Sequence, residues 1–104
     1  MIKQSETQLV KAIMDYLSLE KIFAWRNNTG AFKTERGDFM RFGSVGSPDI
    51  MFLRNGYFYG LEVKVGKNKQ SPAQEQWEIG CRKNGGMYFV ITELEQVVNM
   101  LKTL

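Results

Sequence analysis

The stretch from Pro48 to Lys64, PDIMFLRNGYFYGLEVK, decides the fold of this chain. Two runs rich in apolar and aromatic residues, 49–54 and 57–65, flank Asn55-Gly56, a dipeptide that favours the two-residue turn of a β-hairpin. Asp49 lies six residues before Asn55, and Glu62 lies six residues after Gly56. A hairpin closed by this turn therefore sets the two carboxylates opposite each other.

Side chains alternate between the two faces of a strand, so Glu62 and Lys64 share one face, roughly 7 Å apart at the backbone. Two carboxylates and one ammonium group then converge, and one carboxylate would bind a proton unless a cation intervened. Mg²⁺ or Mn²⁺ fits this cluster, because hard cations bind oxygen ligands, and the backbone carbonyl of Val63 offers a further one. We expect a metal site that activates water for phosphodiester hydrolysis, with Lys64 orienting that water or neutralising developing charge.

A second interpretation of the same residues needs no active site. Asp49 would cap a turn after Pro48, and Glu62 and Lys64 would form a surface ion pair. From chemistry and spacing alone, the two interpretations carry about equal weight.

Length and composition limit the remaining possibilities. The 104 residues suit a single domain, 1–104, and the chain has one cysteine and no histidine. Structural zinc sites and catalytic triads that need a histidine base are therefore excluded. A net charge of +3 permits a nucleic-acid partner without establishing one. Since no apolar run approaches the roughly 20 residues that span a bilayer, and no signal peptide is recognisable, we expect no membrane association and a cytoplasmic location.

The rest of the chain indicates an α/β fold. We expect about four strands in a mixed sheet flanked by helices, in the order α-β-β-β-α-β-α, from helix 5–20, strands 22–26, 49–54 and 57–65, helix 71–84, strand 87–91 and a last helix. The crossover through helix 71–84 makes strands 57–65 and 87–91 parallel neighbours. Strand 87–91 is fully apolar, which favours a central position. Residues 27–47 form a long glycine-rich basic excursion, for which we expect a short hairpin around residues 38–42.

Three helix starts carry the Ser/Thr-x-x-Glu/Gln pattern of a capping box, in which two side chains satisfy each other's backbone amides. The pairs are Ser5 with Gln8, Ser71 with Gln74, and Thr92 with Glu95.

These motifs resemble those of known nucleases. Pro48-Asp49 followed by Glu62-Val63-Lys64 resembles the motif of the PD-(D/E)XK superfamily. Further segments resemble its VRR-NUC branch, of the stand-alone type found in phage and bacteria: Glu6, Trp25-Arg26-Asn27-Asn28, Gly30, Gly46-Ser47-Pro48-Asp49 and Ser71-Pro72-Ala73-Gln74. The resemblance runs from Glu6 to Val90.

The resemblance implies a restriction-endonuclease-like core and a role for each matching residue. Asp49 and Glu62 would bind the metal, Lys64 would be the catalytic lysine, Gln74 would lie close to the active site, and Glu6 would complete the acidic cluster directly or through water. Gln74 and Glu6 also have simpler explanations. Gln74 is at the capping-box position, and an acidic residue such as Glu6 in a first helical turn is stabilised by the helix dipole.

The implied activity is a Mg²⁺- or Mn²⁺-dependent DNA endonuclease without an organic cofactor. The resemblance favours branched DNA, such as flaps or Holliday junctions, and a homodimer would supply two active sites for two cuts. It also implies the cytoplasm of a bacterium or of a phage-infected host cell. Phosphate contacts are expected from two groups of basic residues: Lys67 and Lys69 after the catalytic strand, and Lys33, Arg36 and Arg41 in the long excursion. The alternatives are a non-catalytic nucleic-acid-binding module and a structural or interaction domain.

Overall fold

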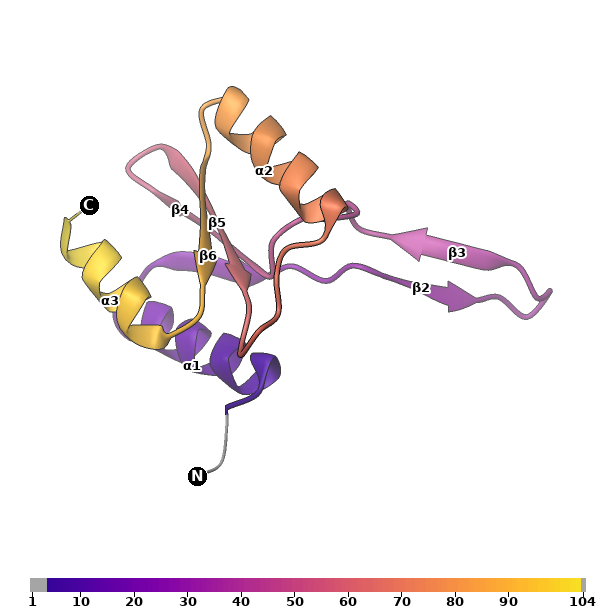
Figure 1. The fold of residues 1–104 in the computed structure, drawn as a ribbon, viewed down its shortest axis with the longest axis horizontal. Coiled ribbons are helices and arrows are strands. Elements are labelled where there is room, and N and C mark those ends of the chain that lie inside the picture. The colour runs from indigo at the N-terminus through magenta and orange to yellow at the C-terminus, as the bar shows by residue number, and fades with distance from the viewer. Residues whose placement is uncertain (1–3, 104) are drawn as a thin grey trace.

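The computed structural model describes residues 4–103 and has a mixed sheet with helices on both faces (Figure 1). Its elements in chain order are α1 (Glu6–Leu19), β1 (Phe23–Arg26), β2 (Gly30–Lys33), β3 (Phe39–Phe42), β4 (Ile50–Arg54), β5 (Tyr57–Val63), α2 (Pro72–Lys83), β6 (Met87–Ile91) and α3 (Leu94–Thr103). Within the described residues, no helix combines the length and the apolar character needed to cross a membrane.

The main sheet has four strands in the order β1-β4-β5-β6. Strand β4 is antiparallel to both β1 and β5, whereas β5 and β6 are parallel and are joined by α2. The turn at Asn55-Gly56 has both residues at positive φ, 53° and 83°, as this type of tight hairpin requires. These observations confirm the predicted α/β class, the mixed sheet and the parallel crossover.

The two faces of the sheet are covered differently. Helices α1 and α3 pack on one face, where the hydrophobic core contains Leu9, Ile13, Leu17, Ile50, Phe52, Leu61, Val97 and Leu101. Helix α2 packs on the opposite face over β6 and β5, with the Trp77 ring 6.2 Å from that of Phe58 and 6.0 Å from that of Tyr88. Glu62 belongs to this second face, since it alternates with the core residues Leu61 and Val63 along β5.

The central position predicted for strand 87–91 is wrong, because β6 lies at the edge of the sheet. Its apolar sequence has another cause. Met87, Phe89 and Ile91 pack against the core, while Tyr88 is fully buried on the face that α2 covers. Burial of both faces accounts for the apolar residues up to Phe89, whereas Val90 is 39% exposed on the same face as Tyr88.

The excursion 27–47 contains more structure than predicted. A hairpin is present, but residues 39–42 form only its second strand, β3, and pair with β2, a strand that we did not predict. The turn at residues 34–38 is closed by hydrogen bonds from the Thr34 backbone to the Asp38 carbonyl (2.8 Å) and from the Asp38 backbone to the Thr34 hydroxyl (3.1 Å). This β2–β3 hairpin, here called the arm, is a separate two-stranded sheet that projects from the body (Figure 1).

Two of the three predicted capping boxes are present, at Ser5 with Gln8 and at Ser71 with Gln74. The third is wrong by one residue. The side-chain oxygen of Gln96, not of Glu95, accepts hydrogen bonds from the backbones of Thr92 (2.6 Å) and Glu93 (3.0 Å). Since α3 begins at Leu94, Gln96 is its third residue and therefore holds the capping position.

Candidate active site

The β4–β5 hairpin brings Asp49 and Glu62 together. Ile50 pairs with Leu61, so the next residues outward, Asp49 and Glu62, lie opposite each other as predicted. The Asp49 carboxylate accepts a hydrogen bond from the backbone amide of Val63 (2.7 Å), and its carbonyl accepts one from the backbone of Asn27 (2.8 Å). Asp49 is thus fixed by a strand on each side.

The residues before Asp49 are held by a network that the sequence analysis did not assign. The side-chain amide of Asn27 donates to the Ser47 hydroxyl (2.6 Å) and to the Pro48 carbonyl (3.0 Å). The Ser47 hydroxyl in turn donates to the Ser44 carbonyl (2.6 Å). Asn27 belongs to a segment noted for its resemblance, but its sequence gave no sign that the amide reaches this loop.

Gly60 is a second residue whose role only the structure reveals. A Cβ at this position would lie 2.7 Å from Cγ of Pro48, a side chain that is fully buried. Pro48 therefore packs into the space that the glycine leaves on β5. The available signal was weak: a lone glycine inside a strand often marks close approach of another segment.

Glu62 lies at the centre of the site and is only 2% exposed. Its Oε1 accepts a hydrogen bond from the side-chain amide of Gln74 (2.7 Å) and lies 3.8 Å from the ammonium group of Lys64. Its Oε2 is buried and accepts no hydrogen bond from the described residues. Burial, followed by the negative charge of Asp49, raises the pKa of Glu62 from 4.5 to about 8, although Lys64 opposes the shift.

Gln74 combines the two roles that were considered for it. Its side-chain oxygen accepts from the Ser71 backbone (2.8 Å) to close the capping box, while its nitrogen donates to Glu62. The amide has a different group for each interaction, so the capping role and the contact with the site coexist. The first turn of α2 is thereby tied to the β5 carboxylate.

Glu6 lies at the periphery of the site. Its charge contributes to the raised pKa of Glu62, which places it within electrostatic range, and its Oε2 accepts a hydrogen bond from the Asn68 side chain (3.2 Å). No hydrogen bond is found between Glu6 and Glu62 among the described residues. Asn68, in the loop after β5, was not predicted to contact the acidic cluster.

The donor set suits a hard divalent cation. In residues 4–103, no cluster of three or more His, Cys, Asp or Glu side chains is arranged to hold a metal. Mg²⁺, however, commonly uses one or two carboxylates and completes its shell with waters and substrate phosphates. The unpartnered Oε2 of Glu62, beside a second carboxylate, is the kind of oxygen that such an ion would satisfy.

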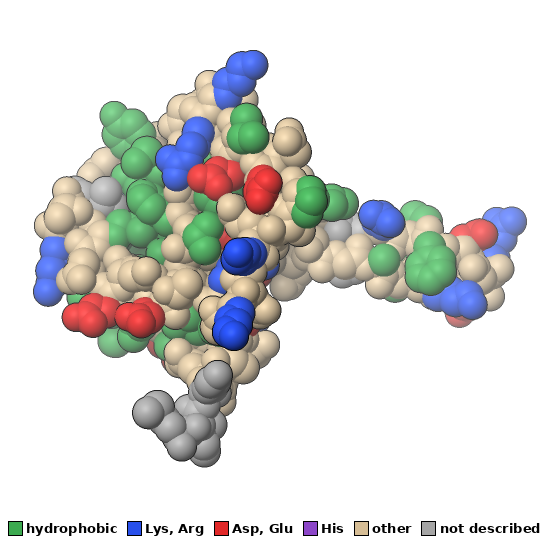
Figure 2. Space-filling view, viewed as in Figure 1, with side chains coloured by type: hydrophobic (Ala, Val, Ile, Leu, Met, Phe, Trp, Pro, Cys, Tyr) green, Lys and Arg blue, Asp and Glu red, His purple; other side chains and the backbone are tan. Residues whose placement is uncertain are grey.

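The predicted basic residues form two separate groups. Lys67 and Lys69 are exposed in the loop that follows β5 and Lys64. Lys33, Arg36 and Arg41 are exposed on the arm, where Arg36 lies in the turn and the other two lie in strands. Lys and Arg side chains are visible on both the body and the arm in Figure 2.

The comparisons with known proteins bear on the fold. The sequence matches no family model and no curated protein. The structure matches a solved structure described as "VRR_NUC domain", with a TM-score of 0.67 and 22% sequence identity, over 93% of this chain and 94% of the other. This likeness agrees with the resemblance inferred from the motifs. The chain therefore has the fold of a VRR_NUC domain.

Proposed function

We propose that this chain is a divalent-metal-dependent nuclease that hydrolyses phosphodiester bonds in DNA. The observation that carries the proposal is Glu62: a buried carboxylate with one unpartnered oxygen, next to Asp49 and within 3.8 Å of the Lys64 ammonium group. Burying an unsatisfied charged group is costly unless a ligand completes its shell. A cation at this point would offset that cost.

Each residue of the site then has a chemical task. Asp49 and Glu62 would hold Mg²⁺ or Mn²⁺, with the Val63 carbonyl as a further oxygen and Glu6 acting through water. When bound, the metal supplies Lewis-acid polarisation of the phosphodiester and lowers the pKa of water. Lys64 orients the attacking water or neutralises the charge that develops on the phosphate oxygens. Gln74 holds Oε1 of Glu62, so Oε2 would be the oxygen available to bind the metal.

One feature supports a nuclease, and a second supports branched DNA as its substrate. The fold is that of a VRR_NUC domain, whose name denotes a nuclease. The exposed lysines and arginines lie on two surfaces, the arm and the loop after β5, which suits contacts with more than one duplex segment. Two cuts across a four-way junction need two sites, so we propose a homodimer as the working unit.

Cleavage of labelled linear, flap and four-way-junction DNA in Mg²⁺, Mn²⁺ and EDTA tests the proposal. We expect cutting in at least one metal, none in EDTA, and loss of activity in Asp49→Ala, Glu62→Ala and Lys64→Ala. Asp15→Ala and Lys11→Ala are matched controls, because these residues form an exposed ion pair on α1 and should leave cleavage unchanged.

Two outcomes would contradict the proposal. A wild-type protein that binds DNA but cuts it in neither metal would instead be a non-catalytic binding module. A Glu62→Ala variant that cuts as well as the wild type would assign the activity to another site or to a contaminant.

A further inference from the structure

The two faces of the arm differ in chemistry. The β2–β3 register pairs Ala31 with Arg41 and Lys33 with Phe39, so these four side chains share one face by strand alternation. Phe39 is 75% exposed, and neither Lys33 nor Arg41 forms an ion pair with a described residue. One face of the arm thus presents an aromatic ring between two unpaired cations. We call it the basic-aromatic face.

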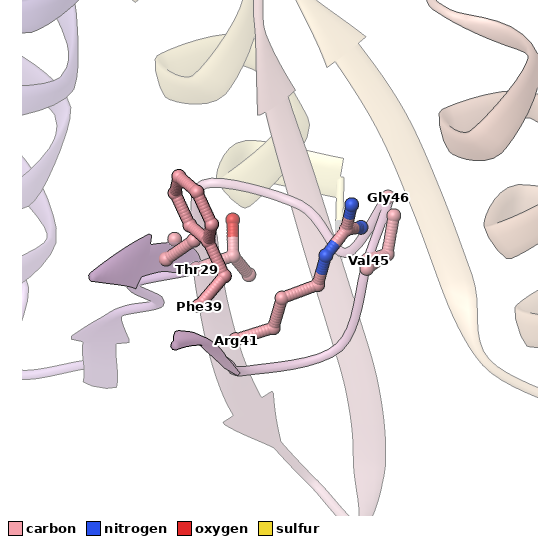
Figure 3. Close-up of a pocket in the computed structure, with 7 residues that line it drawn as sticks. Thr29, Phe39, Arg41, Val45 and Gly46 are labelled. Carbon is pink, nitrogen blue, oxygen red and sulfur yellow. The ribbon is translucent and has the colours of Figure 1, made fainter. Parts of the chain in front are cut away.

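A pocket of about 590 Å³ opens where this face meets the body (Figure 3). Ala31, Phe39 and Arg41 line it from the arm, Thr29 lines it just before β2, and Val45 and Gly46 line it from the loop that leads to Asp49. The Arg41 side chain extends toward Val45 and Gly46. The pocket is therefore apolar along the arm and carries a guanidinium group at its rim.

The rim of the pocket lies next to the candidate active site. Gly46 has a φ of +86°, and a Cβ there would clash with the backbone carbonyl of Ala73 and lie 3.1 Å from the backbone nitrogen of Gln74. Gln74 is the residue whose side chain contacts Glu62. The loop that lines the pocket thus packs against the first turn of α2, which contacts the carboxylate cluster through Gln74.

We propose that this pocket binds an unpaired nucleotide of the DNA strand, with its base stacked on Phe39 and its phosphate contacted by Arg41. The proposal rests on the DNA substrate proposed above. Stacking on an aromatic ring is available to every base, but only to a base that is not already stacked and paired within a duplex. Flaps and branch points offer such bases next to the bond to be cut, whereas an intact linear duplex does not.

Binding measured in EDTA tests this inference separately from cleavage. The probes are a labelled single strand, a flap and a blunt linear duplex, with 2-aminopurine at the unpaired position of the flap. We expect Phe39→Ala to weaken flap and single-strand binding about tenfold and to relieve 2-aminopurine quenching, because one stacking contact is lost. Duplex binding should change little, and Phe39→Trp should restore flap binding. The melting temperature should also change little, since the ring is exposed.

The arm supplies matched controls. Arg36→Ala removes the same charge as Arg41→Ala, but from the turn, outside the pocket lining. Met40→Ala shortens a side chain that is 50% exposed on the opposite face. We expect Arg41→Ala to weaken flap binding several-fold more than Arg36→Ala, and Met40→Ala to have little effect.

The inference is overturned if wild type binds none of the probes, if Phe39→Ala weakens duplex and flap equally, or if Met40→Ala has the same effect as Phe39→Ala. Cleavage decides the other proposal independently. Flap binding that depends on Phe39, without cutting in either metal, would support the pocket and refute the nuclease. If the protein cuts DNA and Phe39→Ala changes neither its affinity nor its cleavage rate, the nuclease is supported and the pocket is refuted.

Discussion

Replacing Glu62 by glutamine should stabilise the metal-free protein at alkaline pH. Glutamine is nearly isosteric and can still accept the hydrogen bond from Gln74, but it carries no charge into a site where Glu62 is 2% exposed and faces Asp49. The wild-type carboxylate loses its proton as the pH rises, and the folded state then contains a buried anion beside a second one. The variant has no such group.

The direction and size of the effect follow from the pKa of Glu62. Burial and Asp49 raise it from 4.5 to about 8, so the folded protein holds a proton that the unfolded chain has released between these values. Its contribution to the free energy of unfolding is complete below pH 4.5 and is lost as the pH rises through about 8. A shift of this size corresponds to at most about 5 kcal/mol. We expect the free energy of unfolding of the wild type to fall by most of this amount as the pH rises, and that of Glu62→Gln to show no such fall.

Urea unfolding in EDTA at about pH 5 and about pH 9 measures this difference. Mn²⁺ supplies a second readout. A ligand that binds only the folded state at a hundred times its dissociation constant adds about 2.7 kcal/mol, and this gain should appear in the wild type and largely vanish in Glu62→Gln. Glu95→Gln is the control, because Glu95 is an exposed residue of α3.

The reasoning is refuted if wild type and Glu62→Gln show the same pH dependence in EDTA. Glu62 would then not be the buried, proton-binding carboxylate described above. An equal gain from Mn²⁺ in both proteins would place the metal elsewhere.

Two further predictions concern the support of the site. Gly60→Ala should lower stability by about 1–3 kcal/mol and reduce cleavage, because the new methyl group displaces Pro48 and hence its neighbour Asp49. Thermal unfolding measures the stability, and cleavage rates measure the activity. The control is Gly80→Ala, in open space on α2, which should instead stabilise the protein by up to about 1 kcal/mol. Gln8→Ala should cost about 1 kcal/mol as a lost cap on α1 and leave the metal affinity unchanged. Gln74→Ala should cost about 1–3 kcal/mol more, because it also removes the hydrogen bond to buried Glu62, and it should lower the affinity for Mn²⁺. Equal metal affinity in the two variants would show that Gln74 acts only as a cap.

Local rules predicted the parts of the fold in which neighbouring residues decide the structure. The Asn55-Gly56 turn fixes the register of β4 and β5, so the meeting of Asp49 with Glu62 followed from counting residues. The capping boxes at Ser5 and Ser71 are equally local. At the third helix the pattern predicted Glu95, and it failed because α3 begins at Leu94, which makes Gln96 its third residue.

Errors arose where distant segments decide the outcome. The apolar sequence of β6 reflects the burial of Tyr88 under α2 and of Ile91 in the core, and it does not indicate which strands lie beside β6, so the edge position was missed. The contacts of Asn27 with Ser47 and Pro48 span twenty or more residues and depend on how β1 ends against β4. The arm was missed in part because β2 contains only four residues and adds nothing to the main core.

The length of the hairpin between Asp49 and Glu62 can change only in steps of two residues if the two carboxylates are to stay opposite each other. Extra residues added in equal number to both strands at the Asn55-Gly56 end would lengthen the hairpin and leave the two carboxylates facing each other. A single residue added to one strand would shift the register or force a bulge, and a one-residue shift moves every side chain to the other face. Chains that keep the site should therefore differ from one another by an even number of residues between Asp49 and Glu62. This rule concerns only the length of the segment and holds whatever residues the strands contain.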